Sequence, residues 1–413
     1  MYTGEGFVVT NSYQMARAVR RIKPLRHWML AWAAIVLMLG GCTMVGPDLV
    51  KPEAPLLDEW KEKGAPGLSV GQTDYSTWWR AFEDPVLENL IEKAYQQNLS
   101  LQVAGLRIYA ARAQLGRAVG FLYPQQQSAS GALTNNKLSS STETPFIDSN
   151  FNALRLGFDA TWELDIWGKF RRSVQSGLAN LEATVASYDN VLVSLTAEVA
   201  RTYIVIRTLE RRLVIAEENV KMQERSLRIV NVRFTEGAVS ELDVAQAKSL
   251  LTDTQALIPR LESSLRQAQN ALAILLGVLP GELKDLLNGP MDIPVAAETV
   301  VIDLPNNLLR RRPDIRLAEL RVATQSPQIG IAKADLYPQF LLFANIGLRS
   351  TDATSVSGQN ALGDIFSYKS LFWNAGPCFN WDILNYGRIR NSVRVEDARF
   401  QQLVVTYKNT VLN

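Results

Sequence analysis

Hydrophobic and polar residues alternate without a break along residues 154–166, which read LRLGFDATWELDI. Every even-numbered residue in this segment is apolar, and the odd-numbered residues include Arg155, Asp159 and Glu163. Because successive side chains of a strand point to opposite faces, the segment predicts a strand with one apolar and one polar face. Such a strand is long for a soluble domain. Its apolar face could contact either a protein core or lipid, and the pattern of this one strand leaves both open.

The spacing of apolar residues changes after Gly168, from every second residue to about every 3.5 residues. This spacing is typical of coiled-coil helices, and it continues on both sides of the segment RFTEGAVSELDVAQ at 233–246. Gly237 is the expected C-cap of the first helix and Ser240 the N-cap of the second. The pattern predicts a long helical hairpin over 168–277, with a buried pair of core helices as the alternative.

The chain contains an internal repeat. Residues 100–125 align without gaps with residues 314–339, and both segments end in LYPQ. Farther on, WELDIWGKFRRSV at 162–174 aligns with WDILNYGRIRNSV at 381–393. A repeat of this length indicates duplication of a half-protein rather than a solenoid.

Each copy of the repeat supplies two expected strands joined by a polar loop. In the second copy the alternation places Asn380 and Asp382 on the polar face. Four strands are too few to close a barrel within one chain. The expected strands are 125–138, 154–166, 339–350 and 371–383.

The N-terminus adds a targeting signal to this picture. Residues 20–42 have a basic start, an apolar run and small residues before Cys42, which is typical of a signal peptide over 1–41. The segment LGGC resembles a bacterial lipobox, in which Cys42 is acylated and becomes a lipid anchor. The alternative is an ordinary anchor helix with a chance cysteine.

Charge and residue inventory exclude several functions. Residues 1–41 hold five basic residues and one acidic residue of the 43 and 41 in the chain, so the remainder has a net charge of −2 and no nucleic-acid footprint. The single histidine, His27, lies in the expected signal peptide. We find no phosphate-binding glycine motif and no CxxC pair, and we expect no catalytic residue, cofactor or metal site. A hydrolase would have to rely on a Ser–Lys pair or on carboxylates.

Seven segments in this order resemble the TolC-like outer membrane efflux family, in its lipoprotein branch. They are LGGCTMVGPDLVKPEAP (39–55), WWRAFEDPVLENLIEKAYQQNLSLQVA (78–104), ELDIWGKFRRSV (163–174), RFTEGAVSELDVAQAK (233–248), NALAILLGVLPGEL (270–283), LPNNLLRRRPDIRLAE (304–319) and ADLYPQF (334–340). The resemblance implies a mainly α protein with membrane β-structure. In the family a homotrimer shares one twelve-stranded outer membrane β-barrel, to which each protomer gives four strands, and long coiled-coil helices form an α-barrel across the periplasm.

The resemblance also implies a function. It predicts a passive, non-enzymatic exit duct in the bacterial outer membrane, lipid-anchored and extending into the periplasm. Its expected partners are outer membrane lipid, a periplasmic adaptor and an inner-membrane pump of the RND type. The alternatives are the export duct of a type I secretion system and a periplasmic coiled-coil adaptor or structural lipoprotein.

The resemblance assigns roles to individual residues. The adaptor-binding tip would comprise Gly237, Val239, Ser240 and Asp243, and the barrel lumen would comprise Arg155, Asp159, Glu163, Asp165, Asn380 and Asp382. Three of these carboxylates, on Asp159, Glu163 and Asp165, predict an acidic lumen that favours cations. An aromatic girdle would comprise Trp162, Trp167, Trp373 and Trp381.

The resemblance divides the chain as follows: 1–41 signal peptide, 42–83 lipidated extended segment, 84–121 helices of the first repeat, 122–167 strands one and two, 168–277 long hairpin, 278–313 equatorial segment, 314–335 first helix of the second repeat, 336–384 strands three and four, and 385–413 start of a second long helix. Family members continue beyond this point, so we expect a C-terminally truncated sequence. Pro327 is expected to bend its helix.

Overall fold

The computed structural model describes most of the chain after the expected lipidation site. The described residues are 44–51, 68–70, 76–137, 139, 150–289, 292–295, 300–302, 309, 311–352 and 365–413. The expected signal peptide and Cys42 lie outside them. Two compact units can be distinguished: the first holds Met1–Val50, Gln114–Leu178 and Ala323–Gln401, and the second holds Lys51–Ala113, Ala179–Val322 and Gln402–Asn413.

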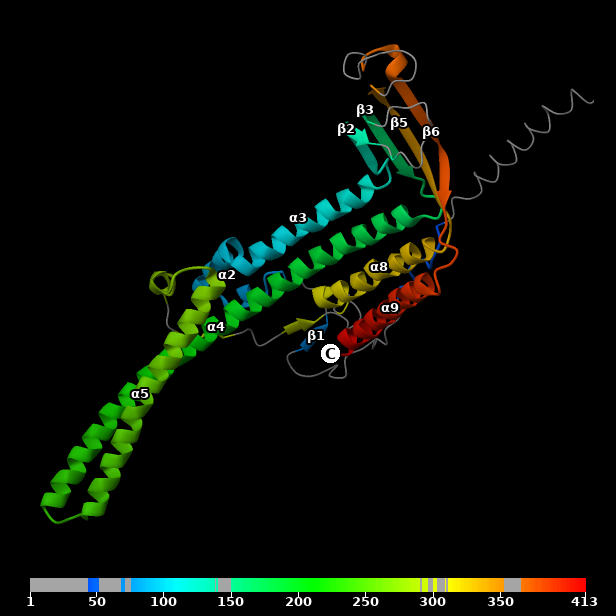
Figure 1. Cartoon of the computed structure of the whole chain (residues 1–413). Coiled ribbons are helices and arrows are strands. Elements are labelled where there is room, and N and C mark those ends of the chain that lie inside the picture. The colour runs from blue at the N-terminus through cyan, green and yellow to red at the C-terminus, as the bar shows by residue number, and fades with distance from the viewer. Residues whose placement is uncertain are drawn as a thin grey trace, which may run out of the picture. The chain divides into compact units, whose positions relative to one another are not determined.

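The first unit contains a four-stranded antiparallel sheet in the order β2-β3-β5-β6 (Figure 1). The strands are β2 (Gln126–Lys137), β3 (Asn150–Glu163), β5 (Gln339–Thr351) and β6 (Leu371–Asn380). The prediction of four strands in two consecutive pairs is confirmed.

Two of these strands end three residues earlier than their alternation predicts, β3 at Glu163 and β6 at Asn380. The expected ends at residues 166 and 383 are therefore wrong. Beyond Glu163 the backbone donates one more bond to β5, from Leu164 N to Phe340 O at 2.8 Å, and then turns toward the next helix. Apolar alternation continues through this turn, so the pattern alone does not reveal where pairing stops.

The strand register places like faces together. Phe158 of β3 lies opposite Ala129 of β2 and Ile346 of β5, and Ile346 lies opposite Trp373 of β6. Asp159, one residue farther along β3, lies opposite Asn345. Because facing residues share a side of the sheet, the apolar rows of β3, β5 and β6 lie on one face, to which β2 adds Ala129 and Leu133.

Long helices account for most of the remaining chain. They are α3 (Leu99–Gly120), α4 (Lys169–Thr235), α5 (Glu241–Leu276), α8 (Pro313–Ala334) and α9 (Arg388–Leu412). The 67 residues of α4 make a helix about 100 Å long. The distal part of α4 and α5 lie side by side as the predicted hairpin (Figure 1). Pro327 lies inside α8, which continues to Ala334.

The core of the second unit forms around α2 (Pro85–Gln97). Asp84 begins this helix, because its carboxylate accepts hydrogen bonds from the backbone N–H groups of Val86 at 2.8 Å and Leu87 at 3.0 Å. One face of α2 is fully buried against α4 and α5 in a single apolar cluster, whose largest members are Leu87, Leu90, Ile91, Val199, Tyr203, Ile206, Leu272 and Leu276.

Both units also contain shorter elements. They are η1 (Trp78–Phe82), η2 (Pro280–Glu282), α6 (Leu283–Leu286) and, in the first unit, η3 (Tyr368–Ser370). A two-stranded parallel sheet joins β1 (Leu68–Val70) to β4 (Val300–Ile302). Within the described residues, every helix is too short or too polar to cross a bilayer. The functional names given to ranges of the chain, such as the equatorial segment, stay predictions.

Candidate functional site

The apolar face of the sheet is exposed in the part of the chain that the structure describes. Phe158 is 67% exposed and Trp373 is 73% exposed. Six further large apolar side chains are exposed on the same face: Leu133, Leu156, Leu342, Ile346, Leu371 and Phe379. A contiguous apolar surface of this kind needs an apolar environment, and the outward face of a membrane strand supplies the same alternation.

The polar face carries a hydrogen-bonded cluster centred on Asp159. Its carboxylate accepts hydrogen bonds from Ser130 Oγ at 3.0 Å and from Asn345 Nδ2 at 2.7 Å. Arg155 Nη2 forms an ion pair with the same carboxylate at 3.6 Å. Three strands therefore join through polar side chains on this face, as expected for a wet lumen.

The charge on the polar face differs from the acidic lumen that the sequence predicts. Arg349 of β5 lies directly opposite Arg155, so the polar face of the four strands carries two arginines as well as the carboxylates of Asp159 and Glu163. Asp165, the third expected acid, lies beyond the end of β3. The alternation places Arg349 on a polar face but does not reveal that it faces Arg155, because register depends on tertiary pairing.

The carboxylate of Asp165 caps α4 instead of lining a strand. It accepts hydrogen bonds from the backbone N–H groups of Phe170 at 2.9 Å and Arg171 at 3.0 Å, and from Arg171 Nε at 3.0 Å. Asp382 likewise lies beyond β6, where it forms an ion pair with Arg388 at 3.3 Å. The expectation that Asp165 and Asp382 belong to the strands is wrong, because β3 ends at Glu163 and β6 at Asn380. Asn380 is the last residue of β6.

A segment near the N-terminus is docked at the junction between β3 and α4. Val45 N donates a hydrogen bond to Trp167 O at 3.0 Å. The guanidinium of Arg172, of which only 4% is exposed, donates to Val45 O at 3.2 Å and forms an ion pair with Asp48 at 2.9 Å. A Cβ at Gly46 would overlap Gly330 of α8, so only glycine allows this approach. Sequence reasoning missed this docking, because its partners lie far apart in the chain.

Three of the four tryptophans of the expected girdle are bonded near the same end of the sheet. The indole N–H of Trp162 donates to Leu122 O at 3.2 Å, that of Trp167 to Pro338 O at 2.8 Å, and that of Trp381 to Leu336 O at 3.1 Å. Trp373 lies toward the opposite end of β6, on the apolar face. This placement is compatible with two interfacial levels, and the girdle stays a prediction.

The hairpin tip is built from the four residues that the resemblance singles out. Gly237 has a positive φ of 71°, and Ser240 begins α5 with a capping box in which Asp243 accepts a hydrogen bond from Ser240 N at 2.8 Å. Bonds from Ser240 lower the pKa of Asp243 because they stabilise its carboxylate, so the cap weakens as pH falls through that lowered value. Both predicted caps are confirmed, whereas adaptor binding at Val239 and its neighbours stays a prediction.

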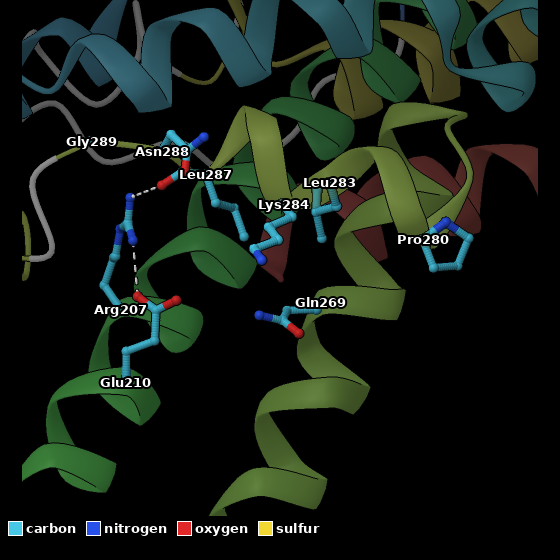
Figure 2. A pocket seen from close by; sticks show the side chains of 9 residues that line it. All are labelled: Arg207, Glu210, Gln269, Pro280, Leu283, Lys284, Leu287, Asn288 and Gly289. Carbon is cyan, nitrogen blue, oxygen red and sulfur yellow. Dashed lines mark hydrogen bonds and ion pairs between the residues drawn. The ribbon is translucent and has the colours of Figure 1, made fainter.

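The second unit contains a cavity of about 390 Å³. It is lined by Arg207, Glu210, Gln269, Pro280, Leu283, Lys284, Leu287, Asn288 and Gly289. Figure 2 shows that the guanidinium of Arg207 is already engaged, donating to Leu287 O at 2.8 Å and pairing with Glu210 at 2.9 Å. It also donates to Tyr203 Oη at 3.2 Å, and burial raises the pKa of Tyr203 to about 12. These contacts give Arg207 a structural role.

Comparison with known proteins agrees with this architecture. Residues 90–278 and 304–413 match the outer membrane efflux protein family. Nodulation protein T of Rhizobium leguminosarum bv. viciae is 33% identical over 391 residues, which cover 94% of this chain and 76% of that protein. The probable outer membrane lipoprotein SilC of Salmonella typhimurium is 28% identical over 380 residues, covering 91% of this chain and 78% of that protein.

Solved structures show the same fold. The outer-membrane channel OprN superposes with a TM-score of 0.79 at 31% identity, covering 89% of this chain and 80% of the channel. The family match favours a channel over the adaptor and hydrolase alternatives. This chain is thus the outer membrane channel component of an efflux system and belongs to the outer membrane efflux protein family.

Proposed function

We propose that three copies of this chain assemble into one outer membrane duct with a twelve-stranded barrel wall. The observation that supports it best is the four-stranded sheet with one exposed apolar face and one hydrogen-bonded polar face. The edges of this sheet, β2 and β6, carry backbone groups that need partners in lipid. Three sheets joined edge to edge would satisfy every edge, whereas four strands alone cannot close.

A matched pair of alanines on β2 tests this proposal. Ala129 lies opposite Phe158 on the apolar face, and Ala132 lies opposite Arg155 on the polar face. We expect Ala129→Glu to abolish the trimer in outer membrane fractions, because it places a charge in lipid, whereas Ala132→Glu should preserve it. Chemical cross-linking followed by denaturing electrophoresis would measure the trimer. Equal amounts of trimer in the two variants would contradict the assignment of the faces.

We further propose that the tip between α4 and α5 docks a periplasmic adaptor, through which an inner-membrane pump of the RND type delivers substrate. Gly237, Ser240 and Asp243 are exposed, and the capping box gives the tip a defined backbone shape. Val239 is half-buried between them. A rigid, exposed turn is well suited to docking because little conformational entropy is lost on binding.

The tip can be tested without disturbing its caps. A photo-cross-linking amino acid at Val239 should capture a periplasmic adaptor in cells, and the same residue at Leu250, which is 52% exposed on α5, serves as the control away from the turn. Capture of an adaptor from Leu250 but not from Val239 would contradict docking at the tip.

We also propose that Cys42 carries a lipid anchor. The LGGC sequence supports this, and one relative is named a probable outer membrane lipoprotein. Radioactive palmitate should label the full chain in cells and should not label the Cys42→Ser variant. Undiminished labelling of that variant would rule out acylation at Cys42.

A further inference from the structure

Two arginines face each other on the polar side of the sheet. In the pairing of β3 with β5, Arg155 lies directly opposite Arg349. Directly opposite residues have Cβ atoms about 5 Å apart, and like charges at this distance repel each other. Such a pair is favourable only where negative charge offsets it.

The negative charge near this pair offsets only part of its positive charge. Arg155 forms its ion pair with Asp159 at 3.6 Å, at the long end of such contacts. Within the described part of the chain, the side chain of Arg349 has no hydrogen bond or ion pair, and it is exposed. The carboxylate of Asp159 therefore pairs with one of the two guanidinium groups, and it already accepts hydrogen bonds from Ser130 and Asn345.

The neighbouring residues hold Arg155 in a defined position. Gly157 and Gly347 lie opposite each other on the polar face, two residues from Arg155 and Arg349 along their strands. They leave room for the ring of Phe372. A Cβ on Gly347 would lie 3.0 Å from Phe372 Cε1. The guanidinium of Arg155 lies over this ring, 5.1 Å from its centroid. A guanidinium above a ring face keeps its N–H groups at its edge, and those that do not pair with Asp159 can bind a ligand.

We propose that Arg155 and Arg349 form a binding site for the oxyanion groups of solutes in the duct, namely phosphate, sulfate or carboxylate. Two guanidinium forks on one wet surface match the paired oxygens of such groups, and the anion relieves the repulsion between them. Phe372 is a positioning residue that orients Arg155.

The site itself lies within one chain, whereas its arrangement in the duct depends on the proposed trimer. Three copies would place six guanidinium groups at one level of the lumen. Such a ring would concentrate anionic solutes at that level, opposite to the cation preference that the carboxylates alone predict.

The test is calorimetric titration of tripolyphosphate into the purified full chain in non-ionic detergent at low salt. We expect saturable binding that weakens as salt rises. Arg155→Gln and Arg349→Gln should each weaken binding about tenfold, because each removes charge-assisted hydrogen bonds. The control is Arg390→Gln, which removes an equal charge from an exposed position on α9 and should change the affinity less than about twofold.

Three outcomes would overturn the site. They are no saturable binding by the unsubstituted chain, an equal loss in Arg390→Gln, and full affinity in Arg349→Gln. Phe372→Leu should reduce the affinity about threefold while both arginines remain, because it removes only the stacking. Circular dichroism of each variant would show that the fold is kept.

The same samples separate this site from the proposed function. Cross-linking reports the trimer independently of tripolyphosphate binding. Loss of binding with an intact trimer in Arg155→Gln supports the site, whereas a chain that binds tripolyphosphate but never forms trimers would contradict the proposed assembly alone.

Discussion

The two copies of the internal repeat have the same junction between strand and helix, yet they use it differently. At both junctions a tryptophan donates to the carbonyl of the leucine in LYPQ, Trp162 to Leu122 and Trp381 to Leu336. A glycine with a positive φ then begins the turn into the helix, at 77° for Gly168 and 82° for Gly387. The shared residues therefore produce a shared local geometry.

The environments of the two junctions differ. The first junction is covered by the docked segment, since Val45 bonds to Trp167 and the buried Arg172 binds Val45 and Asp48. At the second junction Leu384 is 81% exposed and Tyr386 is 96% exposed.

The repeat aligns Arg172 with Asn391 and Asp165 with Leu384. The second copy therefore lacks both the arginine that binds Val45 and Asp48, which we call the clamp, and the aspartate that caps the helix. The two copies thus share one turn, and the residues that differ between them let the first copy hold the N-terminal segment. The other copy keeps an open apolar surface, which the proposed trimer would cover with a neighbouring subunit.

The largest expected effect comes from the two glycines of the turns. Alanine at either position adopts a left-handed backbone at a cost of about 1 kcal/mol. A Cβ at Gly168 would also lie 2.5 Å from Met44 Cγ, whereas a Cβ at Gly387 would meet only Asn391 Nδ2 at 3.7 Å. We expect Gly168→Ala to lower the free energy of unfolding by about 3 kcal/mol.

Gly387→Ala is the matched control and should lower it by about 1 kcal/mol. Urea unfolding of both variants in detergent would measure the difference. Equal destabilisation would mean that Met44 does not dock at the first junction.

The next effect comes from the clamp. Arg172→Met keeps an unbranched apolar stem but removes the guanidinium that donates to Val45 O, and we expect a loss of about 2 kcal/mol. Asn391→Ala, at the matching position of the second copy, should cost less than about 0.5 kcal/mol. Limited proteolysis would detect release of the N-terminal segment in Arg172→Met only. A segment that stays protected in this variant would contradict the clamp.

A smaller effect is expected from the helix cap. Asp165→Ala removes the acceptor for the N–H groups of Phe170 and Arg171 and should cost about 1 kcal/mol. Leu384→Ala, at the matching position, removes no cap. Hydrogen exchange in the first turns of α4 and α9 would show faster exchange only in α4. Unchanged exchange at Phe170 would show that the cap does not stabilise the helix.

The last effect, about as large as that of the cap, concerns the feature that the two copies share. Trp162→Phe and Trp381→Phe each remove one indole hydrogen bond, and each should cost about 1 kcal/mol. The two losses should agree, because the bonds measure 3.2 Å and 3.1 Å. Thermal unfolding of both variants would check this, and a large inequality would break the equivalence of the copies.

The sequence by itself determined the elements of this protein. Alternation around Phe158 and Asp159 predicted two-faced strands, and heptad spacing around Gly237 and Ser240 predicted the hairpin with its caps. These signals are local, since each depends on residues a few positions apart. The repeat could also be recognised from sequence, because it requires only that two segments be compared.

Tertiary structure decided which residues meet. It placed Arg349 opposite Arg155, put Asp165 at a helix cap beyond the end of its expected strand, and brought Arg172 to Val45. Register and docking depend on contacts between segments as much as about 200 residues apart, and alternation carries no information about partner choice at that range. The faces of the sheet could therefore be derived from sequence, whereas the charge pattern on its polar face could not.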